Sequence, residues 1–187
     1  MNQCVAYCGG MDPKDFSVTT KLFPDAKRDA YQNYGKTFRA VSNWKADCAV
    51  VPYEKSLSGE IGYVVDLMFE SDLFANRVVS AEDDLQTIHY AVLSRDEDKD
   101  APESDFFLLM FTVKNAAGTL AKAFDVISAN GFNMRTVHSR PLAGQPWHFY
   151  FYCECAGDDR SEAGQKMLSE LRNVCESIKV MGRYKAE

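Results

Sequence analysis

A short segment in the second half of the chain has the residue types of a corner that binds a carboxylate. Its sequence is Asn-Ala-Ala-Gly-Thr-Leu, and it lies between an apolar strand-like run, Phe106–Val113, and a helical pattern that starts at Leu120. The backbone N–H groups of Ala117, Gly118 and Thr119 would lie at a helix N-terminus, where unpaired donors and the helix dipole favour the carboxylate of a free amino acid. Gly118 lets a ligand approach the backbone, but a glycine here also suits a tight turn that binds nothing.

Arg140 is a second candidate for ligand contact, in the segment Ser139-Arg140-Pro141 at the end of a strand-like run. Its guanidinium has the chemistry to bind an anion. It could equally pair with a neighbouring subunit or remain a solvated charge at the strand end. The residues alone leave these three interpretations open.

Six cysteines are scattered along the chain without a Cys-x-x-Cys pair. Cys153 and Cys155, with His138 or His148, have the ligand types of a zinc site, but the spacing is not that of a zinc module. Both cysteines continue the apolar stripe of a strand-like segment, where Cys behaves as a small buried hydrophobic residue. We therefore expect no metal site and no other cofactor.

The second half of the chain must position these residues with a strand, helix, strand, strand, helix, strand order. Residues 120–127 have helical spacing, and residues 147–155 alternate with period two. This βαββαβ order predicts a ferredoxin-like unit with two helices on one face of an antiparallel sheet. The other sheet face needs cover, so we expect pairing with a second copy of the chain.

The first half alternates strand-like runs, at residues 5–8, 49–51 and 90–93, with helical patterns. Asp12 followed by Pro13 predicts a helix N-terminus. We expect that helix to have one apolar face formed by Phe16, Thr20 and Phe23. Such alternation predicts an α/β lobe with a mostly parallel sheet.

Residues 96–105 separate the two halves. They contain one Pro and mostly acidic side chains, which is typical of a linker. The whole chain has 187 residues and a net charge of −6, which argues against binding to nucleic acid. Because no apolar run reaches the roughly 20 residues that span a bilayer, and the first residues lack a signal-peptide pattern, we expect a cytosolic protein that does not insert into membranes.

The two segments at the corner and at the strand end resemble the two signatures of the ACT regulatory domain of prephenate dehydratases. The resemblance runs through residues 106–184, and it implies that L-phenylalanine is bound as a feedback effector. It implies these effector-binding residues: Asn115, Ala116, Ala117, Gly118, Thr119, Leu120, Ser139, Arg140 and Pro141. The acidic residue that the family has before Ser-Arg-Pro is His138 in this chain.

The first half resembles part of the prephenate dehydratase catalytic domain. Residues 5–17, 46–59 and 87–95 are each similar to one segment of that domain. The family has two lobes with the active site in the cleft between them. Here about a dozen residues connect a helix that ends near Leu73–Phe74 to the returning strand, too few for a second αβ lobe. We therefore predict a reduced lobe at 1–95, a linker at 96–105 and an ACT domain at 106–187.

The resemblance also implies that the catalytic set is incomplete. The family's Thr-Arg-Phe triplet corresponds to Ile88, His89 and Tyr90, and isoleucine can neither donate a proton nor accept a hydrogen bond. Thr87 would point to the opposite face of the strand, which it would share with His89. Weak candidates for catalysis remain at Glu54, Ser56, Thr87 and His89.

These observations favour a regulatory protein that binds L-Phe and has an incomplete dehydratase lobe. The alternative is an active prephenate dehydratase whose cleft is rebuilt by dimerisation, converting prephenate to phenylpyruvate, water and carbon dioxide. The first half could also contact a full-length biosynthetic enzyme, or bind another small anion at its glycine turn. The sequence does not separate these roles.

Overall fold

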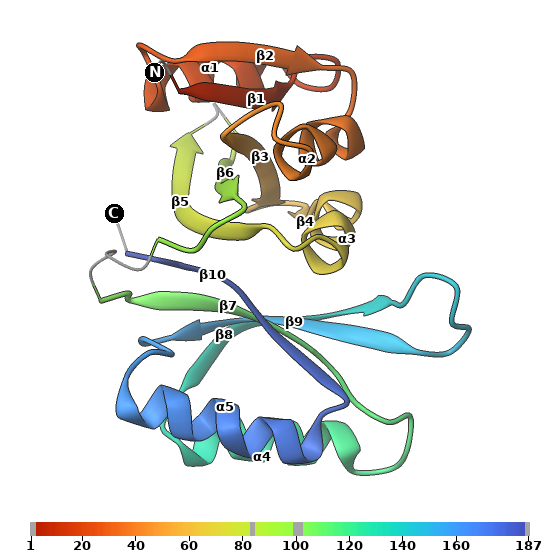
Figure 1. The fold of residues 1–187 in the computed structure, drawn as a ribbon. Coiled ribbons are helices and arrows are strands. Elements are labelled where there is room, and N and C mark those ends of the chain that lie inside the picture. The colour runs from red at the N-terminus through yellow and green to blue at the C-terminus, as the bar shows by residue number, and fades with distance from the viewer. Residues whose placement is uncertain (1–2, 83–84, 99–102, 186–187) are drawn as a thin grey trace. The chain divides into compact units, whose positions relative to one another are not determined.

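The computed structural model describes residues 3–82, 85–98 and 103–185 (Figure 1). The chain divides into two compact units, residues 1–101 and residues 102–186. The boundary falls within the acidic segment 96–105, of which residues 99–102 lie outside the described residues. Within the described residues, no helix has the length and apolar character needed to cross a membrane.

The first unit is a five-stranded sheet in the order β2-β1-β3-β6-β5, with the short β4 paired to β3. Its helices pack mainly against β1 and β3. Its elements in chain order are β1 (Cys4–Cys8), α1 (Pro13–Leu22), β2 (Lys27–Tyr31), α2 (Tyr34–Ser42), β3 (Cys48–Lys55), β4 (Gly59–Glu60), α3 (Gly62–Glu70), β5 (Phe74–Glu82) and β6 (Thr87–Ser94).

The prediction of a mostly parallel sheet is wrong for this unit. Strand β1 is parallel to β2 and β3, but β6 is antiparallel to β3, and β5 is antiparallel to β6. The connection between β5 and β6 has only four residues, 83–86, whereas parallel neighbours need a crossover of a dozen or more. The predicted helix end near Leu73–Phe74 is also displaced, because α3 ends at Glu70 and Phe74 begins β5.

Helix α1 begins where the sequence predicts, since the Asp12 side chain accepts a hydrogen bond from the Lys14 N–H and Pro13 is the first helical residue. Its predicted apolar face is wrong. The helix buries Asp15, Val18 and Thr19, and the Phe16 side chain is 49% exposed. A carboxyl group therefore lies inside the first unit.

The second unit has the predicted βαββαβ order of elements. Its four strands form the order β10-β7-β9-β8, each antiparallel to its neighbour, and Figure 1 shows both helices on one face of this sheet. The core between sheet and helices contains Phe107, Phe111, Met167 and Leu171. Its elements are β7 (Phe106–Thr112), α4 (Thr119–Ala129), β8 (Asn133–Pro141), β9 (Phe149–Ala156), α5 (Glu162–Val174) and β10 (Ser177–Tyr184).

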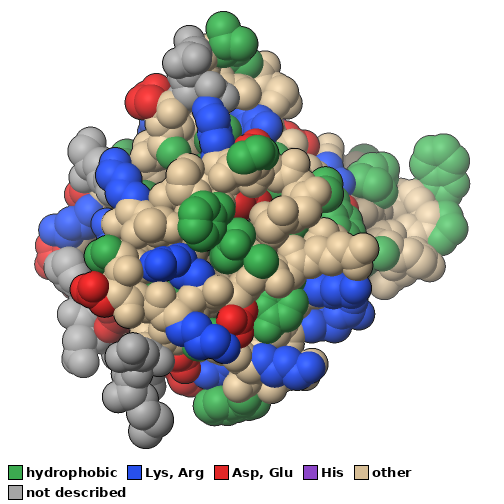
Figure 2. Space-filling model, turned by 90° about the horizontal axis from the view of Figure 1, so that it is seen from above, with side chains coloured by type: hydrophobic (Ala, Val, Ile, Leu, Met, Phe, Trp, Pro, Cys, Tyr) green, Lys and Arg blue, Asp and Glu red, His purple; other side chains and the backbone are tan. Residues whose placement is uncertain are grey.

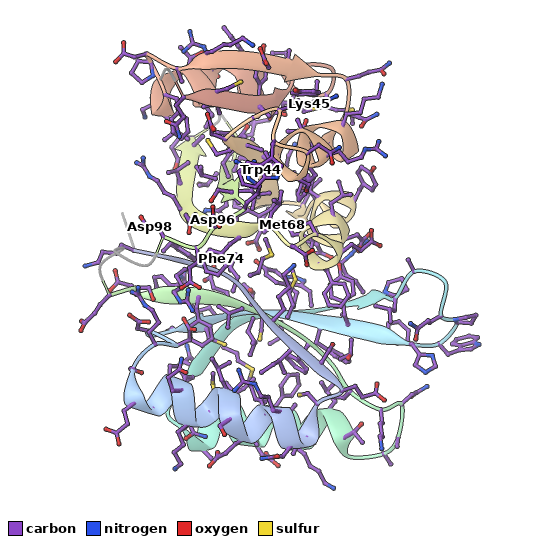
Figure 3. All side chains as sticks on the ribbon, in the orientation of Figure 1. Trp44, Lys45, Met68, Phe74, Asp96 and Asp98 are labelled. Carbon is purple, nitrogen blue, oxygen red and sulfur yellow. The ribbon has the colours of Figure 1, made fainter. Side chains whose placement is uncertain are left out.

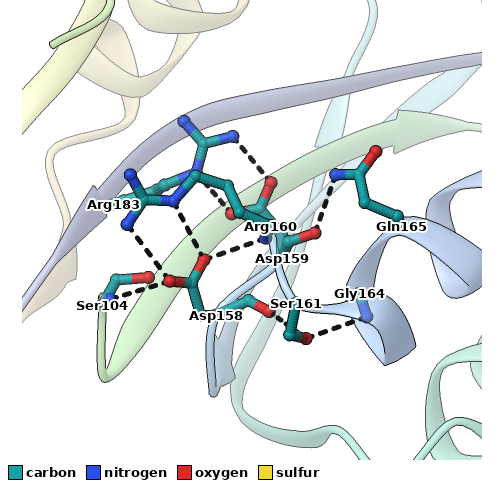
Figure 4. Close-up of polar contacts among 8 residues, drawn as sticks. All are labelled: Ser104, Asp158, Asp159, Arg160, Ser161, Gly164, Gln165 and Arg183. Atoms are coloured by element: carbon teal, nitrogen blue, oxygen red, sulfur yellow. Dashed lines mark hydrogen bonds and ion pairs between the residues drawn. The ribbon is translucent and has the colours of Figure 1, made fainter. Parts of the chain in front are cut away.

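Two aspartates after β9 form ion pairs and hydrogen bonds between separate elements of the second unit (Figure 4). Asp158 accepts hydrogen bonds from the Ser104 N–H and from the Arg160 side chain, and these outweigh partial burial and lower the pKa of Asp158 to about 2. Asp159 is fully buried and pairs with both Nε and Nη2 of Arg183 on β10. These contacts join the start of β7, the turn before α5 and the last strand.

Candidate functional site

A cavity of about 170 Å³ lies where β7 passes into α4. One wall comes from the corner between these elements, and the other comes from the beginning of β9 and the turn before it. The cavity is lined by Val113, Lys114, Asn115, Ala116, Thr119, Leu120, Trp147, Phe149 and Phe151. It therefore has a polar end at the corner and an aromatic wall from the hairpin.

The backbone of the corner takes a left-handed conformation at Gly118, with free space beside it. This residue is the N-cap of α4 with φ +80°, and a Cβ built on it would meet no protein atom within 4 Å. The Thr119 hydroxyl donates to the carbonyls of Lys114 (2.6 Å) and Ala116 (2.8 Å), which fixes the turn. Among the hydrogen bonds of the described residues, none uses the N–H groups of Ala117 and Gly118. Two backbone donors thus remain for a ligand beside a helix N-terminus.

A hydrogen bond from Asn115 connects the corner to the aromatic wall. Its Nδ2 donates to the Trp147 carbonyl at 3.1 Å, and the turn between β8 and β9 is closed by the Leu142 N–H, which donates to the His148 carbonyl at 2.8 Å. Trp147 has φ +63° and is 80% exposed. We did not predict Trp147, Phe149 or Phe151 as site residues, because period-two spacing marks them only as one face of a strand.

The segment Ser139-Arg140-Pro141 is divided between the two faces of the sheet. Ser139 is opposite Phe151 and Pro141 is opposite Phe149, so both share the sheet face of the cavity. Arg140 is opposite Tyr150 and lies on the other face. None of the three lines the cavity. The structure thus brings together Asn115, Ala116, Thr119 and Leu120 with the aromatic wall and leaves Arg140 apart from them.

In the first unit, Ile88 lies in the hydrophobic core, 1% exposed. Thr87 lies on the opposite face, and its hydroxyl is 3.2 Å from both carboxylate oxygens of Glu82. The Thr87 N–H donates to the Ser56 hydroxyl at 3.0 Å. Thr87 and Ser56 are therefore neighbours, and neither occupies the buried position of Ile88.

His89 is the next residue on the face of Thr87 and is opposite Glu54 in the sheet. Its Nδ1 is 3.1 Å from the Ser80 hydroxyl, and its ring centroid is 6.2 Å from that of Tyr53. The four weak candidates, Glu54, Ser56, Thr87 and His89, thus lie at the adjoining ends of β3 and β6.

Asp15 is a polar residue that the sequence did not single out for function. Its side chain is fully buried, and Oδ2 accepts a hydrogen bond from the Tyr34 hydroxyl at 3.2 Å. Burial raises the pKa of Asp15 to about 7, although the hydroxyls of Tyr34 and Tyr90 and the more distant Lys55 act against this shift. Its position in the first turn of α1 predicts an ordinary surface acid, so no local signal reveals the burial.

The cysteines and histidines do not assemble into a metal site in the described parts of the chain. Cys153 and Cys155 are buried with their sulfur atoms 3.8 Å apart, and the hydrogen bond between them and burial raise the pKa of Cys153. His138 stacks on Tyr152, on the sheet face opposite Cys153. His148 is exposed in the turn before β9.

Comparison with known proteins finds matches to one family. Residues 15–100 match the model of the family described as prephenate dehydratase. The bifunctional chorismate mutase/prephenate dehydratase of Aquifex aeolicus is 33% identical over 81 residues, which are 43% of this chain and 22% of that protein. The arogenate dehydratase/prephenate dehydratase 2 of Arabidopsis thaliana is 19% identical over 274 positions, covering 96% of this chain and 72% of the relative. The chain thus spans about a fifth of the Aquifex relative.

Solved structures share the fold over nearly the whole chain. A prephenate dehydratase from Streptococcus mutans has a TM-score of 0.85 at 22% identity and covers 100% of both chains. GqqA, described as a quorum quenching acylase, has a TM-score of 0.82 at 25% identity, over 98% of this chain and 95% of its own. A prephenate dehydratase from Arthrobacter aurescens in complex with L-Phe has a TM-score of 0.82 at 15% identity, over 98% and 90%. The family-model match to residues 15–100 and these relatives support the prephenate dehydratase family, and the solved structures show a shared fold.

Proposed function

We propose that this protein is a regulatory member of the family, in which residues 106–187 form an ACT domain that binds L-phenylalanine. The observation that carries the proposal is the corner before α4. The N–H groups of Ala117 and Gly118, which have no partner among the described residues, lie in sequence between Ala116 and Thr119, and these two residues line an apolar cavity. A free aromatic amino acid has the matching parts, a carboxylate next to an apolar ring. The L-Phe complex of the Arthrobacter protein supports the choice of effector.

The dimensions of the cavity suit a phenyl ring. An apolar cavity of roughly 150 Å³ takes up benzene, and the cavity here has about 170 Å³. With the ring against Phe149 and Phe151, the ligand carboxylate would accept hydrogen bonds from the corner, where the dipole of α4 adds to the attraction. The Oδ1 atom of Asn115 would accept from the ligand's ammonium group, since its Nδ2 is already bonded to Trp147.

The proposal also assigns a reduced lobe to residues 1–95. The alignment with the Arabidopsis relative has 274 positions against 187 residues in this chain, a difference of at least 87 positions that must lie opposite gaps here. Gaps of this extent agree with a missing lobe. Ile88 adds a chemical argument, because a buried alkyl side chain cannot protonate a departing hydroxyl group.

The test is calorimetric titration with L-Phe of the wild type and of Gly118→Ala. The wild type should bind, and its free energy of unfolding should rise by about 2.7 kcal/mol at 100 times the dissociation constant. Gly118→Ala should bind at least about tenfold more weakly, because Ala costs about 1–2 kcal/mol in this left-handed conformation and shifts the corner.

Gly131→Ala is the matched control for this test. Gly131 also has a positive φ and open space where an added methyl group would lie, but it is at the other end of α4. It should lose similar stability and keep L-Phe affinity. The proposal is contradicted if millimolar L-Phe gives neither heat nor a thermal shift, or if both variants lose affinity equally. Tighter binding of L-Tyr or L-Trp would reassign the effector.

We further propose that the second unit pairs with a second copy of the chain. In that unit β8 is bonded to β9 on one side, and Val137 on β8 is 42% exposed. An apolar side chain on an edge strand favours association. Contact with a full-length biosynthetic enzyme is the other partner interaction that this role allows.

A second candidate function is catalysis by a cleft rebuilt from two chains. It is favoured by the polar group at the ends of β3 and β6, where Ser56, Thr87 and Glu82 are joined by hydrogen bonds and His89 is close by. Incubation with prephenate and measurement of phenylpyruvate absorbance decides it. Turnover that is lost in His89→Ala supports this function, and zero turnover at neutral pH excludes it.

A further inference from the structure

A hollow beside α2 gathers positive charge without any acidic side chain. It has a volume of about 340 Å³. Its walls consist of Tyr31, Lys36, Arg39, Ala40, Asn43 and Lys45. None of its three cationic side chains forms an ion pair with another described residue. Basic side chains are also prominent on the face seen in Figure 2, although the chain carries 27 acidic and 21 basic residues.

The placement of Lys36 is unfavourable without a counter-ion. Lys36 lies in the first turn of α2, after the N-cap Asn33, where the helix dipole disfavours a cation, and its Nζ donates a hydrogen bond to the neutral side-chain oxygen of Gln32 at 2.7 Å. Arg39 follows at i+3, so the two like charges are neighbours on one helix surface and repel each other. Arg39 alone would suit the last turn of the helix. The combination with Lys36 and Lys45 needs another explanation, and a bound anion supplies one.

The backbone turn on one side of the hollow is held in place by hydrogen bonds. After α2, the Lys45 N–H donates to the Ala40 carbonyl at 2.8 Å, and Trp44 takes φ +60° to make this tight turn. Arg95 holds the turn, donating to the Ala46 carbonyl at 2.9 Å with its guanidinium 3.9 Å from the centre of the Trp44 ring. Figure 3 shows Trp44 and Lys45 on this connection. A backbone fixed in this way need not be ordered when a ligand binds, which reduces the conformational entropy lost on binding.

We propose that this hollow binds a small dianion, either a phosphate group or a pair of carboxylates, attached to a compact apolar frame. The guanidinium of Arg39 would bind it through two parallel hydrogen bonds, as Arg does with both oxyanions. Lys36 and Lys45 would add point charges, Asn43 a hydrogen bond, and Tyr31 with Ala40 the apolar contact. None of these residues belongs to the corner before α4 or to the candidates on β3 and β6, so the proposal does not depend on L-Phe binding or on dehydratase activity.

The test is calorimetric titration at low ionic strength with two probes, inorganic phosphate and malonate. We expect at least one probe to bind one-to-one with a dissociation constant in the millimolar range or tighter. The probe that binds more tightly shows whether the site prefers a phosphate group or a pair of carboxylates. Arg39→Gln and Lys36→Gln should each weaken binding about tenfold, since hydrogen bonds to charged groups are the strong ones. Both positions are exposed, so both variants should keep the wild-type melting temperature.

Arg172→Gln is the matched control, because Arg172 is an exposed arginine on α5 of the other unit and loses the same charge. It should bind the probe as the wild type does. The proposal is overturned if neither probe binds up to about 10 mM, or if Arg172→Gln weakens binding as much as Arg39→Gln, which would show general charge attraction in place of a site.

Discussion

Among the described residues, each unit buries one aspartate completely, and the two carboxyl groups have different surroundings. Asp159 in the second unit lies against the guanidinium of Arg183, with Oδ2 and Nη2 2.7 Å apart. Asp15 in the first unit has no cation beside it among the described residues. It accepts one hydrogen bond from Tyr34, and its Oδ1 has no hydrogen-bond partner there. A buried carboxyl group thus has a cation beside it in the second unit and none beside it, among the described residues, in the first.

The two carboxyl groups therefore act differently in the fold. A buried ion pair with good geometry joins the elements that supply its two partners. A buried carboxyl without a cation has its pKa raised by desolvation, and for Asp15 the value of about 7 places the change of charge near neutral pH.

The largest effect is expected when the compensated pair is broken. Arg183→Met keeps an unbranched side chain on β10 but leaves Asp159 buried without its cation. We expect a loss of about 3–5 kcal/mol in the free energy of unfolding, the usual cost of removing one partner of a buried pair. Urea unfolding measures it, and hydrogen exchange at β7, β9 and β10 shows that the second unit is the part destabilised.

Arg172→Met is the comparison for this variant, because it removes an exposed arginine in the last turn of α5. It should cost less than about 1 kcal/mol through the helix dipole. If Arg183→Met lowers the free energy of unfolding by less than about 1 kcal/mol, the ion pair does not stabilise the fold, and the contrast between the two aspartates is lost.

The second unit was predictable from its sequence because its signals are local. The helical spacing of residues 120–127, the glycine at 131 and the period-two run near 149–155 each depend on neighbours along the chain, and together they give the order of its elements. Gly118 was predicted for the same reason, and Asn115 was predicted only through the resemblance to the ACT signature. Trp147 was not predicted as part of the cavity, since its position depends on a positive φ and on a hydrogen bond to Asn115, 32 residues away.

The first unit was less predictable because its architecture depends on long-range pairing. In β5, the polar residues Asn76, Arg77 and Ser80 interrupt the apolar pattern, and the strand exists through its bonds to β6. The antiparallel direction of β6 follows from the short connection to β5. The burial of Asp15 depends on Tyr34 and Tyr90, which come from α2 and β6 and could not be placed against it from sequence alone.

Replacement of the uncompensated aspartate, Asp15, should change the free energy of unfolding by a smaller amount, and the size of this change depends on pH. The pKa of Asp15 is raised from 3.8 to about 7, so the folded state binds the proton more tightly than the unfolded state does. This contribution to stability is complete below about pH 4 and is lost as the pH rises through about 7, with a total of roughly 2–4 kcal/mol. Asp15→Asn removes the titration and retains a polar group of the same shape. Its free energy of unfolding should therefore exceed that of the wild type at about pH 8 and approach the wild-type value near pH 4.

Urea unfolding of the wild type, Asp15→Asn and Asp25→Asn across this pH range tests the prediction. Asp25 is exposed in the same unit and undergoes the same chemical change, so its variant should follow the wild-type curve. The two variants differ from the wild type by one carboxyl group each, so the differences between the curves report on the substituted group. If Asp15→Asn follows the wild-type curve as well, a cation or solvent reaches Asp15 in the folded state, and the two buried aspartates then differ only in the partner that compensates them.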